Sequence, residues 1–381
     1  MSENKKICSK CIYDENIPNI SFSSNGICNY CDQIEFLKTK FGTGERKGKE
    51  LLNILINNIK KEGKHKKYDC VVGVSGGTDS SYLLMKAKEW GLSPLAVHYD
   101  NTWNSAIASM NIEKITRSLN VDLYTHVVNN VEVDDIKLAF LKSGVPEFDA
   151  DTDIAFVQVL REAAAKYNIK YILEGHSFMT EGISPIGSNY LDGGYVHDVH
   201  KKFGSIKSKT FPNMTFFQFM KWVLFYRQKF IRPLWYIDYS KENAIKVLKK
   251  NTGWQYYGGH HLENRASSFS HTIWLPRYGI DFRYLSLAAQ VRQKSLDQNQ
   301  AIKIFNSKIK IDKKLVQYVK KRLHLSDVEY LKIMNGEKRT WKEFKTYKKL
   351  FEYLKPLFYI LTRLERVPIS FYLKYCFKIK E

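Results

Sequence analysis

The chain has 381 residues, 44% of them hydrophobic, and carries a formal net charge of +21. Its length suggests about two to three globular domains, and it contains neither a run of roughly eighteen apolar residues nor an apolar segment at its start, which excludes the membrane-spanning and secreted classes. We therefore expect a cytoplasmic protein. The positive charge indicates an anionic partner, such as a nucleotide, RNA or an acidic membrane surface, without choosing among them.

Two Cys-x-x-Cys pairs stand near the start of the chain. Their four thiolates could close tetrahedrally around Zn²⁺, and in a reducing compartment this spacing favours a metal over disulfides. An iron–sulfur site and free thiols are the alternatives. Four ligands with no open position suit a structural zinc better than either of them. We expect a structural zinc held by Cys8, Cys11, Cys28 and Cys31.

A glycine-rich turn follows the first apolar strand. Cys70–Val74 is a short β-branched run typical of a buried parallel strand, and the apolar spacing after the turn predicts a helix. Thr78 or Ser75 can cap this helix, and Asp79 suits its positive end. The Gly-Gly pair lets an anion approach the amides at the helix start, so a phosphate is the expected ligand.

This turn resembles the pyrophosphate loop of the ATP pyrophosphatases, and it lacks the Gly-Lys-Ser/Thr ending of the P-loop NTPases. The resemblance implies that the loop holds the β,γ-phosphates of ATP while the α-phosphate is attacked, which gives adenylation and pyrophosphate release. A tight surface turn is the alternative. The nucleotide-binding residues implied are Ser75, Gly76, Gly77, Thr78, Asp79, Ser80 and Ser81, with Asp79 on the Mg²⁺ side.

The main domain then alternates strands and helices, which predicts a Rossmann-like α/β fold with a doubly wound parallel sheet. Asp100 and Asn101 end the second strand, where ligands sit in open α/β sheets, so they are candidates to meet the adenosine. A polar strand-to-helix turn explains them equally well. The expected strands are 92–99, 121–128 and 171–174, and the expected helices are 104–119, 132–142 and 154–167, the last with Asp153 as its N-cap.

Glu174-Gly-His-Ser177 and Thr180-Glu181 follow the last of these strands. They are similar to a segment that faces the phosphates in related pyrophosphatases. This similarity makes Gly175 a nucleotide-binding candidate and makes His176 and Glu181 catalytic candidates beside Ser75 and Asp79. His176 could equally be a hydrogen-bonded structural residue.

The remaining segments carry weaker signals. Residues 183–213 have weak periodicity and are interpreted as an insertion or lid, whereas 215–227 and 235–251 are expected to be helices. The last region is basic and helical, and it could lie on an anionic membrane, although packing on the catalytic domain or a partner is preferred. The expected domains are a knuckle at 1–45, a main domain at 46–295 and a C-terminal region at 296–381.

The segment from Tyr256 to Arg283 concentrates ionisable groups, which usually serve a site or a buried network. Metal binding by adjacent histidines is the less convincing interpretation. Recognition of an anionic sugar nucleotide is preferred, because guanidinium forks match phosphate bidentately. The candidates are His260, His261, Glu263, Arg265, Arg277 and Arg283.

Taken together, three motifs resemble the N-acetyl sugar amidotransferases of bacterial surface-polysaccharide and flagellar-sugar synthesis, the WbpG and PseA type. This resemblance implies conversion of an acetamido group of a nucleotide-linked sugar to an acetamidino group, with ATP and Mg²⁺, through an O-adenylyl imidate. No motif aligns after about Leu296. The motifs are Cys8-x-x-Cys11 with Gly26-x-Cys28-Asn-Tyr-Cys31, Ser75-Gly-Gly-Thr-Asp-Ser-Ser81, and Tyr257-Gly-Gly-His-His-x-Glu263-x-Arg265.

The reaction needs ammonia, and none of the six cysteines lies in a Gly-x-Cys-x-Gly elbow, so a built-in glutaminase is not expected. The resemblance implies partners similar to the glutaminase and cyclase subunits of imidazole-glycerol-phosphate synthase, and no nucleic acid. The alternative is a tRNA-modifying enzyme that adenylates a base before thiolation or amination. Such thiolases generally need cysteines in the body of the chain, where this sequence has only Cys70.

Overall fold

The computed structural model describes residues 5–185, 189–258, 262–309 and 311–378. In this part of the chain a five-stranded sheet has the order β3-β2-β1-β4-β5, and every neighbouring pair is parallel. The predicted parallel α/β sheet is therefore confirmed. The strands are β1 (Cys70–Gly73), β2 (Pro94–Asp100), β3 (Leu123–Val127), β4 (Tyr171–Leu173) and β5 (Lys229–Ile231).

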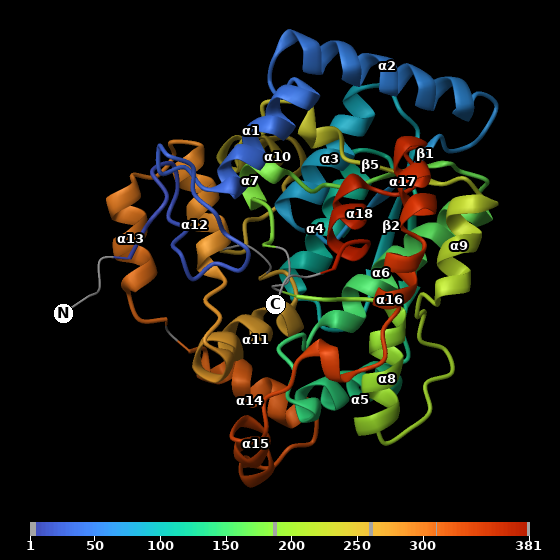
Figure 1. Ribbon diagram of the computed structural model, residues 1–381. Helices are drawn as coiled ribbons and strands as arrows, with labels where there is room; N and C mark the ends of the chain where they lie inside the picture. The colour runs from blue at the N-terminus through green and yellow to red at the C-terminus, as the bar shows by residue number, and fades with distance from the viewer. Residues whose placement is uncertain (1–4, 186–188, 259–261, 310, 379–381) are drawn as a thin grey trace.

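Helices surround this sheet and extend from it on two sides (Figure 1). They are α1 (Asn29–Phe41), α2 (Arg46–Gly63), α3 (Thr78–Glu89), α4 (Ala106–Ser118), α5 (Asn130–Ser143), α6 (Ala150–Lys166), α7 (Phe178–Glu181), α8 (Gly193–Phe203), α9 (Phe216–Leu224), α10 (Lys241–Thr252), α11 (Arg265–Ile273), α12 (Arg283–Arg292), α13 (Gln298–Asn306), α14 (Lys313–Arg322), α15 (Asp327–Met334), α16 (Lys348–Tyr353), α17 (Lys355–Arg363) and α18 (Ile369–Tyr375), with short helices at Pro233–Trp235, Trp274–Tyr278 and Trp341–Glu343.

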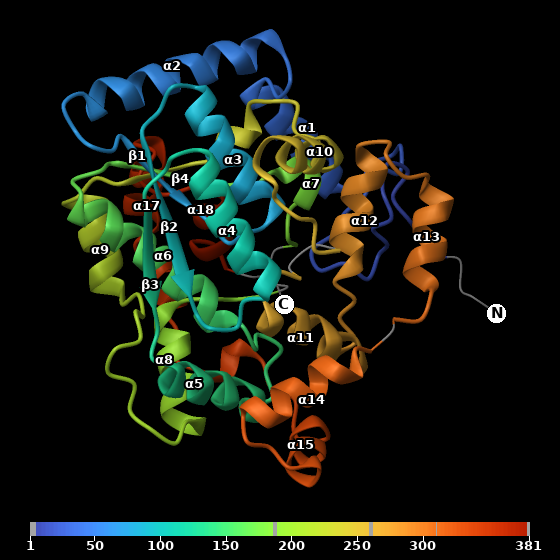
Figure 2. The ribbon, with the colours of Figure 1, turned by 180° about the vertical axis from the view of Figure 1, so that it is seen from behind.

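Both faces of the sheet are covered, which is why β1 is apolar along its whole length. One face packs against α2, α3, α4 and α10, of which α3 and α4 are seen in front of the strands in Figure 2. The other face packs against α5, α6 and α11. Alternate side chains of β1, such as Val71 and Val72, enter opposite cores and are both fully buried.

The strand order reverses between β1 and β4. The chain moves outward from β1 through β2 to β3, and then returns to place β4 and β5 on the other side of β1. In doubly wound sheets the carboxyl ends of the strands at such a point form the ligand-binding crevice. Here these ends lead into the Ser75–Ser81 turn and the segment that contains Gly175, His176 and Glu181.

Two predicted helix caps are wrong. The N-cap of α3 is Gly77, and neither Thr78 nor Ser75 caps it. The N-cap of α6 is Asp149, which makes no side-chain cap bond, so Asp153 lies in the first turn instead. Asp149 makes no cap bond because its carboxylate is held from outside the helix, by Lys137 at 2.7 Å and by Ser267 at 2.5 Å.

The segment interpreted as an insertion or lid contains a buried helix. Within 183–213, α8 places Tyr195, Val196 and Val199 in a core shared with α5. Strand β5 was not predicted, because it has only three residues and lies between the end of an aromatic stretch and Pro233. Helix α10 begins at Lys241 and not at 235, since Ser240 caps it after a short helical turn at Pro233–Trp235.

Two smaller modules flank the sheet (Figure 1). The N-terminal cysteine segment packs against α12 and α13 in one apolar cluster. Helices α16, α17 and α18 pack against α9 through aromatic side chains. In the described residues no helix is long and apolar enough to cross a membrane.

Candidate functional site

The turn after β1 can be made only with glycine at position 76. Gly76 has φ +79°, and a Cβ there would lie 2.3 Å from the Ala108 carbonyl oxygen at the start of α4. The backbone of the turn is therefore pressed against α4. Gly77 has no such backbone neighbour, and a Cβ on it would point toward side chains of the site.

Two side chains that sequence reasoning missed hold this turn from behind. Trp254 Nε1 and Asn111 Nδ2 donate to the Gly76 carbonyl at 3.0 and 3.3 Å. Because the carbonyl and the following amide of a trans peptide point in opposite directions, this anchoring turns the Gly77 amide away from the core. That amide donates to Ser75 Oγ at 3.2 Å. The turn thus presents a fixed amide at the N-terminus of α3, where negative charge is stabilised.

The hydroxyl groups of the turn leave unused hydrogen-bonding capacity. Thr78 Oγ1 and Ser81 Oγ are buried and have no hydrogen-bond partner among the described residues. Ser75 and Ser80 place their hydroxyl oxygens 3.3 Å apart. Buried donors without partners are rare in folded proteins, and a ligand that accepts hydrogen bonds would satisfy them. Phosphate oxygens, which accept hydrogen bonds, fit this set.

Asp79 is held by two residues from far along the chain. Tyr239 donates its hydroxyl to Asp79 Oδ1, and Lys241 Nζ lies 3.1 Å from Asp79 Oδ2. Burial lowers the pKa of Lys241, but Asp79, Glu181 and Glu263 outweigh this effect and raise its pKa above the usual value. The site therefore contains a protonated lysine beside the turn, a cation suited to a polyphosphate. In the sequence analysis Lys241 lies inside the expected helix 235–251 and is not a site candidate.

Gly175 and His176 lie against this same turn. A Cβ on Gly175 would be 2.9 Å from the Asp79 carbonyl carbon and from the Ser80 amide nitrogen, so the glycine lets the segment after β4 approach the first turn of α3. His176 Nδ1 accepts a hydrogen bond from Trp235 Nε1 at 3.3 Å. Burial, with a contribution from Arg232, lowers the pKa of His176 to about 4. His176 is therefore neutral at physiological pH.

Glu181 completes the group of acidic side chains around the turn. Its Oε2 lies 3.9 Å from His176 Nε2, and its Oε1 accepts the Ser177 amide at 3.4 Å. Burial, and secondly the Asp79 carboxylate, raise the pKa of Glu181 to about 8, against the opposing effect of Lys241. This carboxyl can accept or release a proton near neutral pH.

The raised pKa of Glu181 predicts a pH-dependent effect of Glu181→Gln. Between about pH 4.3, where the unfolded carboxyl titrates, and about pH 8, the folded state binds a proton that the unfolded state does not. The free energy of unfolding of the native chain should therefore fall as pH rises through this window. We expect the glutamine variant to gain stability over the native chain, on the order of 2 kcal/mol at high pH and none at low pH. Urea unfolding at several pH values measures this, and a gain that does not change with pH would contradict it. The exposed Glu50→Gln is the control.

Glu263, from the third motif, reaches the turn. Its Oε1 lies 3.1 Å from the Cβ position of Gly77, and the Tyr257 hydroxyl lies 3.2 Å from it. A carboxylate thus stands where the turn would meet an anion. Glu263 Oε2 is buried and has no partner among the described residues. His260 and His261, predicted from the same motif, lie outside the described residues.

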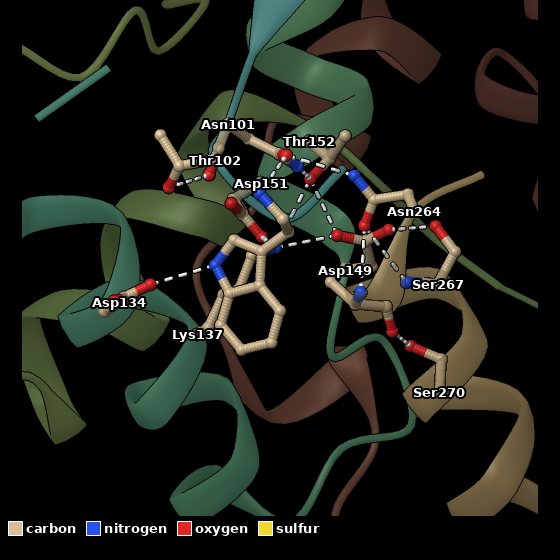
Figure 3. A network of polar contacts seen from close by, with 12 residues as sticks. Asn101, Thr102, Asp134, Lys137, Asp149, Asp151, Thr152, Asn264, Ser267 and Ser270 are labelled. Atoms are coloured by element: carbon tan, nitrogen blue, oxygen red, sulfur yellow. Dashed lines mark hydrogen bonds and ion pairs between the residues drawn. The ribbon is translucent and has the colours of Figure 1, made fainter. Parts of the chain in front are cut away.

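Asp100 and Asn101 end β2, but the structure uses them in the framework. Asn101 is 1% exposed. Its amide nitrogen donates to Thr152 Oγ1 at 2.9 Å, and its oxygen accepts from Asn264 at 3.0 Å (Figure 3). Asp100 Oδ1 accepts the Thr102 amide at 2.8 Å. Asn101 therefore joins β2 to α6 and α11, and its side-chain oxygen and nitrogen both take part in hydrogen bonds of the framework.

The three predicted arginines are placed differently. Arg277 is buried, and its guanidinium donates to the carbonyls of Ile333 and Glu337 at the end of α15. Arg283 is paired with Asp281 at 2.7 Å. Arg265 lies over the Tyr318 ring at 4.6 Å and lines a cavity of about 720 Å³. Arg265 thus reaches a cavity, whereas Arg277 fastens α15 and Arg283 fastens α13.

The four knuckle cysteines come together. Their sulfur atoms lie within 4.8 Å of one another, with Cys8 to Cys31 at 3.8 Å and Cys11 to Cys28 at 3.9 Å. Tetrahedral Zn–S bonds of about 2.3 Å place sulfur atoms roughly 3.8 Å apart, so the set fits Zn²⁺. Among the described residues no other group of three such ligands could hold a metal ion.

A segment in the C-terminal half of the chain matches a known family. Residues 263–357 match the model of the C-terminal domain of WbpG-like LPS biosynthesis proteins. The chain carries a WbpG-like C-terminal domain. The predicted resemblance is confirmed over these residues, and the WbpG-like domain extends well past Leu296, where the sequence analysis finds no motif. It begins at Glu263, beside the glycine turn, and includes Arg265 and the helices from α11 to α16.

Three solved structures resemble the chain at low sequence identity. No curated protein matches the chain. The NMN synthetase from Francisella tularensis has a TM-score of 0.34 at 14% identity, covering 74% of this chain and 95% of that one. The NH3-dependent NAD synthetase from Campylobacter jejuni has 0.30 at 11%, covering 76% and 98%. The predicted subunit of a tRNA methyltransferase from Methanocaldococcus jannaschii has 0.28 at 15%, covering 56% and 90%.

Proposed function

We propose that this chain is an ATP-dependent amidotransferase that converts an acetamido group of a nucleotide-linked sugar to an acetamidino group, in the synthesis of a surface glycan. The observation that carries the proposal is the glycine turn that Trp254 anchors where the strand order of the sheet reverses. The WbpG-like domain begins beside this turn, at Glu263. The name of the matched family supports a role in lipopolysaccharide synthesis. Cytoplasmic location is part of the proposal.

In this proposal the turn binds the β,γ-phosphates of ATP. The phosphate oxygens would accept hydrogen bonds from the Gly77 amide, from the Thr78 and Ser81 hydroxyls and from the first amides of α3, and Lys241 would balance their charge. Bound Mg²⁺ would neutralise further charge on the triphosphate. Because Asp79 already pairs with Lys241, the lysine would turn toward the phosphates when Asp79 meets the ion.

Adenylation makes the acetamido oxygen, which is a poor leaving group, part of AMP, which is a good one. The acetamido oxygen attacks the α-phosphorus, and pyrophosphate departs. Ammonia then attacks the imidate carbon, and AMP departs with the original acetamido oxygen. A proton must leave the attacking nitrogen, and Glu181, whose pKa is raised to about 8, stands beside the turn to receive it.

Ammonia is proposed to come from a separate glutaminase and a cyclase-like subunit. Cys70 is fully buried in β1 and burial raises the pKa of its thiol, which disfavours a thiolate nucleophile there. Cys376 is also buried, and burial raises its pKa to about 11. The isolated chain should therefore use ammonium far better than glutamine. Equal use of both would refute the partner proposal.

The decisive experiment traces the oxygen atom of the acetamido group. The chain is incubated with ATP, Mg²⁺, ammonium and a nucleotide sugar carrying heavy oxygen in its acetamido group. Mass spectrometry should find the heavy oxygen in AMP and a sugar product in which NH replaces that oxygen. Label remaining in the sugar, or release of ADP, would refute adenylation of the acetamido group.

Asp79→Asn tests the site within the same assay. The change removes the charge that positions Lys241 and would meet the metal, so pyrophosphate release should fall about 100-fold. Thermal unfolding and zinc content establish that the variant is folded. Glu50→Gln, on the exposed surface of α2, should keep the native rate. An unchanged rate in the folded Asp79→Asn variant would show that the turn is not the reaction site.

A further inference from the structure

A cavity of about 370 Å³ lies under the C-terminal helices. Its wall is built from α6, the residues at the ends of β4 and β5, α9, α16 and α18, of which the last two are red in Figure 1. Its volume is within the range of small-molecule sites. None of the turn residues 75–81 lines it, so a ligand held there differs from the triphosphate of the proposed function.

A neighbouring cavity of about 350 Å³ lies nearer to the glycine turn. The two cavities share Asp153 and Leu191. Glu181 lines the smaller one, and the Asp79 carboxylate acts on the pKa of Glu181, so this cavity lies beside the phosphate site and suits the sugar nucleotide of the proposed function. The cavity of about 370 Å³ has no part in that reaction.

The wall of the larger cavity contains a buried guanidinium without an acidic partner. Arg161, on α6, is 2% exposed and lines this cavity. Its Nη1 donates to Gln228 Oε1 at 3.4 Å, and its Nε has no hydrogen-bond partner among the described residues. Burial lowers the pKa of Arg161 to about 9, and no carboxylate opposes this effect. The group is still a cation at neutral pH, and a buried charge without a counter-charge is costly.

Two aromatic rings are the other neighbours of this guanidinium. Its central carbon lies 4.7 Å from the centre of the Phe230 ring and 5.5 Å from that of the Phe219 ring. Such contacts attract a cation, but they do not supply the in-plane acceptors that a guanidinium fork binds best. Arg161 therefore keeps unused donor capacity beside the cavity.

The other two cations of this wall have acidic neighbours. Arg232 Nε lies 2.7 Å from Glu174 Oε2. Burial lowers the pKa of Lys374 to about 8, against the opposing effect of the Asp153 and Glu147 carboxyl groups. Of the three carboxyl groups that line the cavity, these contacts involve Glu174 and Asp153.

Asp192, the third carboxyl group of the wall, does not balance Arg161 either. It accepts hydrogen bonds from the Tyr190 hydroxyl and from the amides of Tyr195 and Tyr347. It has no effect on the pKa of Arg161. Arg161 is therefore the cation of this wall that no carboxyl group among the described residues balances.

We propose that this cavity binds a small organic carboxylate, with the carboxylate group on Arg161 and the apolar body against the aromatic wall. A carboxylate matches a guanidinium in charge and in its planar, two-point geometry. One unbalanced positive charge suits the single negative charge of a carboxylate better than the roughly two of a phosphate group. The apolar wall includes Val157, Phe216, Phe230, Phe351 and Phe371.

Benzoate and benzamide test the charge requirement, because they share a ring and nearly a shape but differ in charge. Ligand-observed NMR with the full chain at about pH 7 measures both affinities, since Arg161 is protonated and benzoate is ionised there. Benzoate should bind at least about tenfold more tightly than benzamide. Phenyl phosphate should bind more weakly than benzoate.

Three variants assign the effect to Arg161. Arg161→Met removes the charge and keeps a long apolar chain, so benzoate should bind within about twofold of benzamide. Arg161→Lys keeps a cation and should leave benzoate at least about a threefold advantage. Arg117→Met, which removes an exposed arginine on α4, should bind both ligands as the native chain does.

Stability gives a readout that does not depend on ligands. Because Arg161 is buried without a counter-charge, Arg161→Met should unfold at the same urea concentration as the native chain or at a higher one. A lower urea midpoint would show that Arg161 is kept for structure, and would overturn the proposal.

The binding experiment has four further results that would overturn the proposal. They are equal affinities for benzoate and benzamide, tighter binding of phenyl phosphate, an unchanged benzoate advantage in Arg161→Met, and no benzoate binding up to about 10 mM, roughly the weakest Kd expected for a ligand of this size. None of these results bears on amidation, because the site lies outside the glycine turn.

Discussion

Replacing Gly76 by alanine should lower ATP-dependent pyrophosphate release by at least about 100-fold. The residue has φ +79°, where a side chain is strained by roughly 1–2 kcal/mol. The larger effect comes from the Cβ, which would stand 2.3 Å from the Ala108 carbonyl oxygen. The carbonyl belongs to the backbone of α4, and the Cβ is bonded directly to the backbone of the turn. Neither can move away alone, so the turn or α4 must shift.

Movement of the turn breaks the arrangement that Trp254 and Asn111 impose. Their hydrogen bonds to the Gly76 carbonyl orient the Gly77 amide, and a displaced peptide would no longer aim it at the phosphates. The rate should therefore fall further than the loss of stability explains. Pyrophosphate release is measured at a temperature where circular dichroism shows both proteins folded.

Gly91→Ala is the matched control for this prediction. Gly91 lies beyond the opposite end of α3 and has φ +72°, a similar backbone strain. The only atoms near its Cβ belong to the flexible end of the Lys60 side chain. This variant should lose about 1 kcal/mol of stability and keep its activity. Equal loss of activity in both variants would show that backbone strain alone, and not the position of the turn, explains the Gly76 result.

Replacing Cys28 by serine should release the zinc and unfold the knuckle. The segment has few apolar residues of its own, so its order depends on the metal and on α12 and α13. Two contacts join the knuckle to those helices. Arg292 donates to the sulfur atoms of Cys31 at 3.2 Å and Cys11 at 3.5 Å, and Gln298 donates to the carbonyls of Cys8 and Cys11.

The effect should reach the cavity of about 350 Å³ that Glu181 and Tyr284 line, but not the glycine turn. Helix α12 carries Tyr284, Leu285 and Ser286 into the cavity wall, whereas the turn is held by Trp254 and Asn111. We expect the variant to bind sugar nucleotide at least about tenfold more weakly and to bind ATP within about twofold of the native chain. Calorimetry measures both affinities, and atomic absorption measures zinc.

Cys376→Ser provides the control, because Cys376 is buried at the other end of the chain in the aromatic cluster of α16–α18. It should keep its zinc. Limited proteolysis gives a readout independent of ligands, with new cleavage near the N-terminus only in the Cys28 variant. A Cys28→Ser protein that retains one zinc per chain, or that loses it and binds sugar nucleotide normally, would contradict this account of the knuckle.

The sequence by itself determined the local features. The β-branched run of β1, the Gly-Gly turn and the acidic first turn of α3 follow rules that act over a few neighbouring residues, and so does the spacing of the knuckle cysteines. The alternation of strands and helices was enough to predict a doubly wound parallel sheet. Helix caps were less predictable, since Asp149 is held by side chains from α5 and α11 that its neighbours in sequence do not reveal.

Only the tertiary structure decided what surrounds the turn. Tyr239, Lys241 and Trp254 meet it because the sheet order brings β4, β5 and the chain after them back beside β1. The same packing buries Arg277 against α15, and it gathers four carboxyl groups around one cavity. These meetings depend on which surfaces pack together, and a pattern of neighbouring residues carries no information about partners more than a hundred positions away.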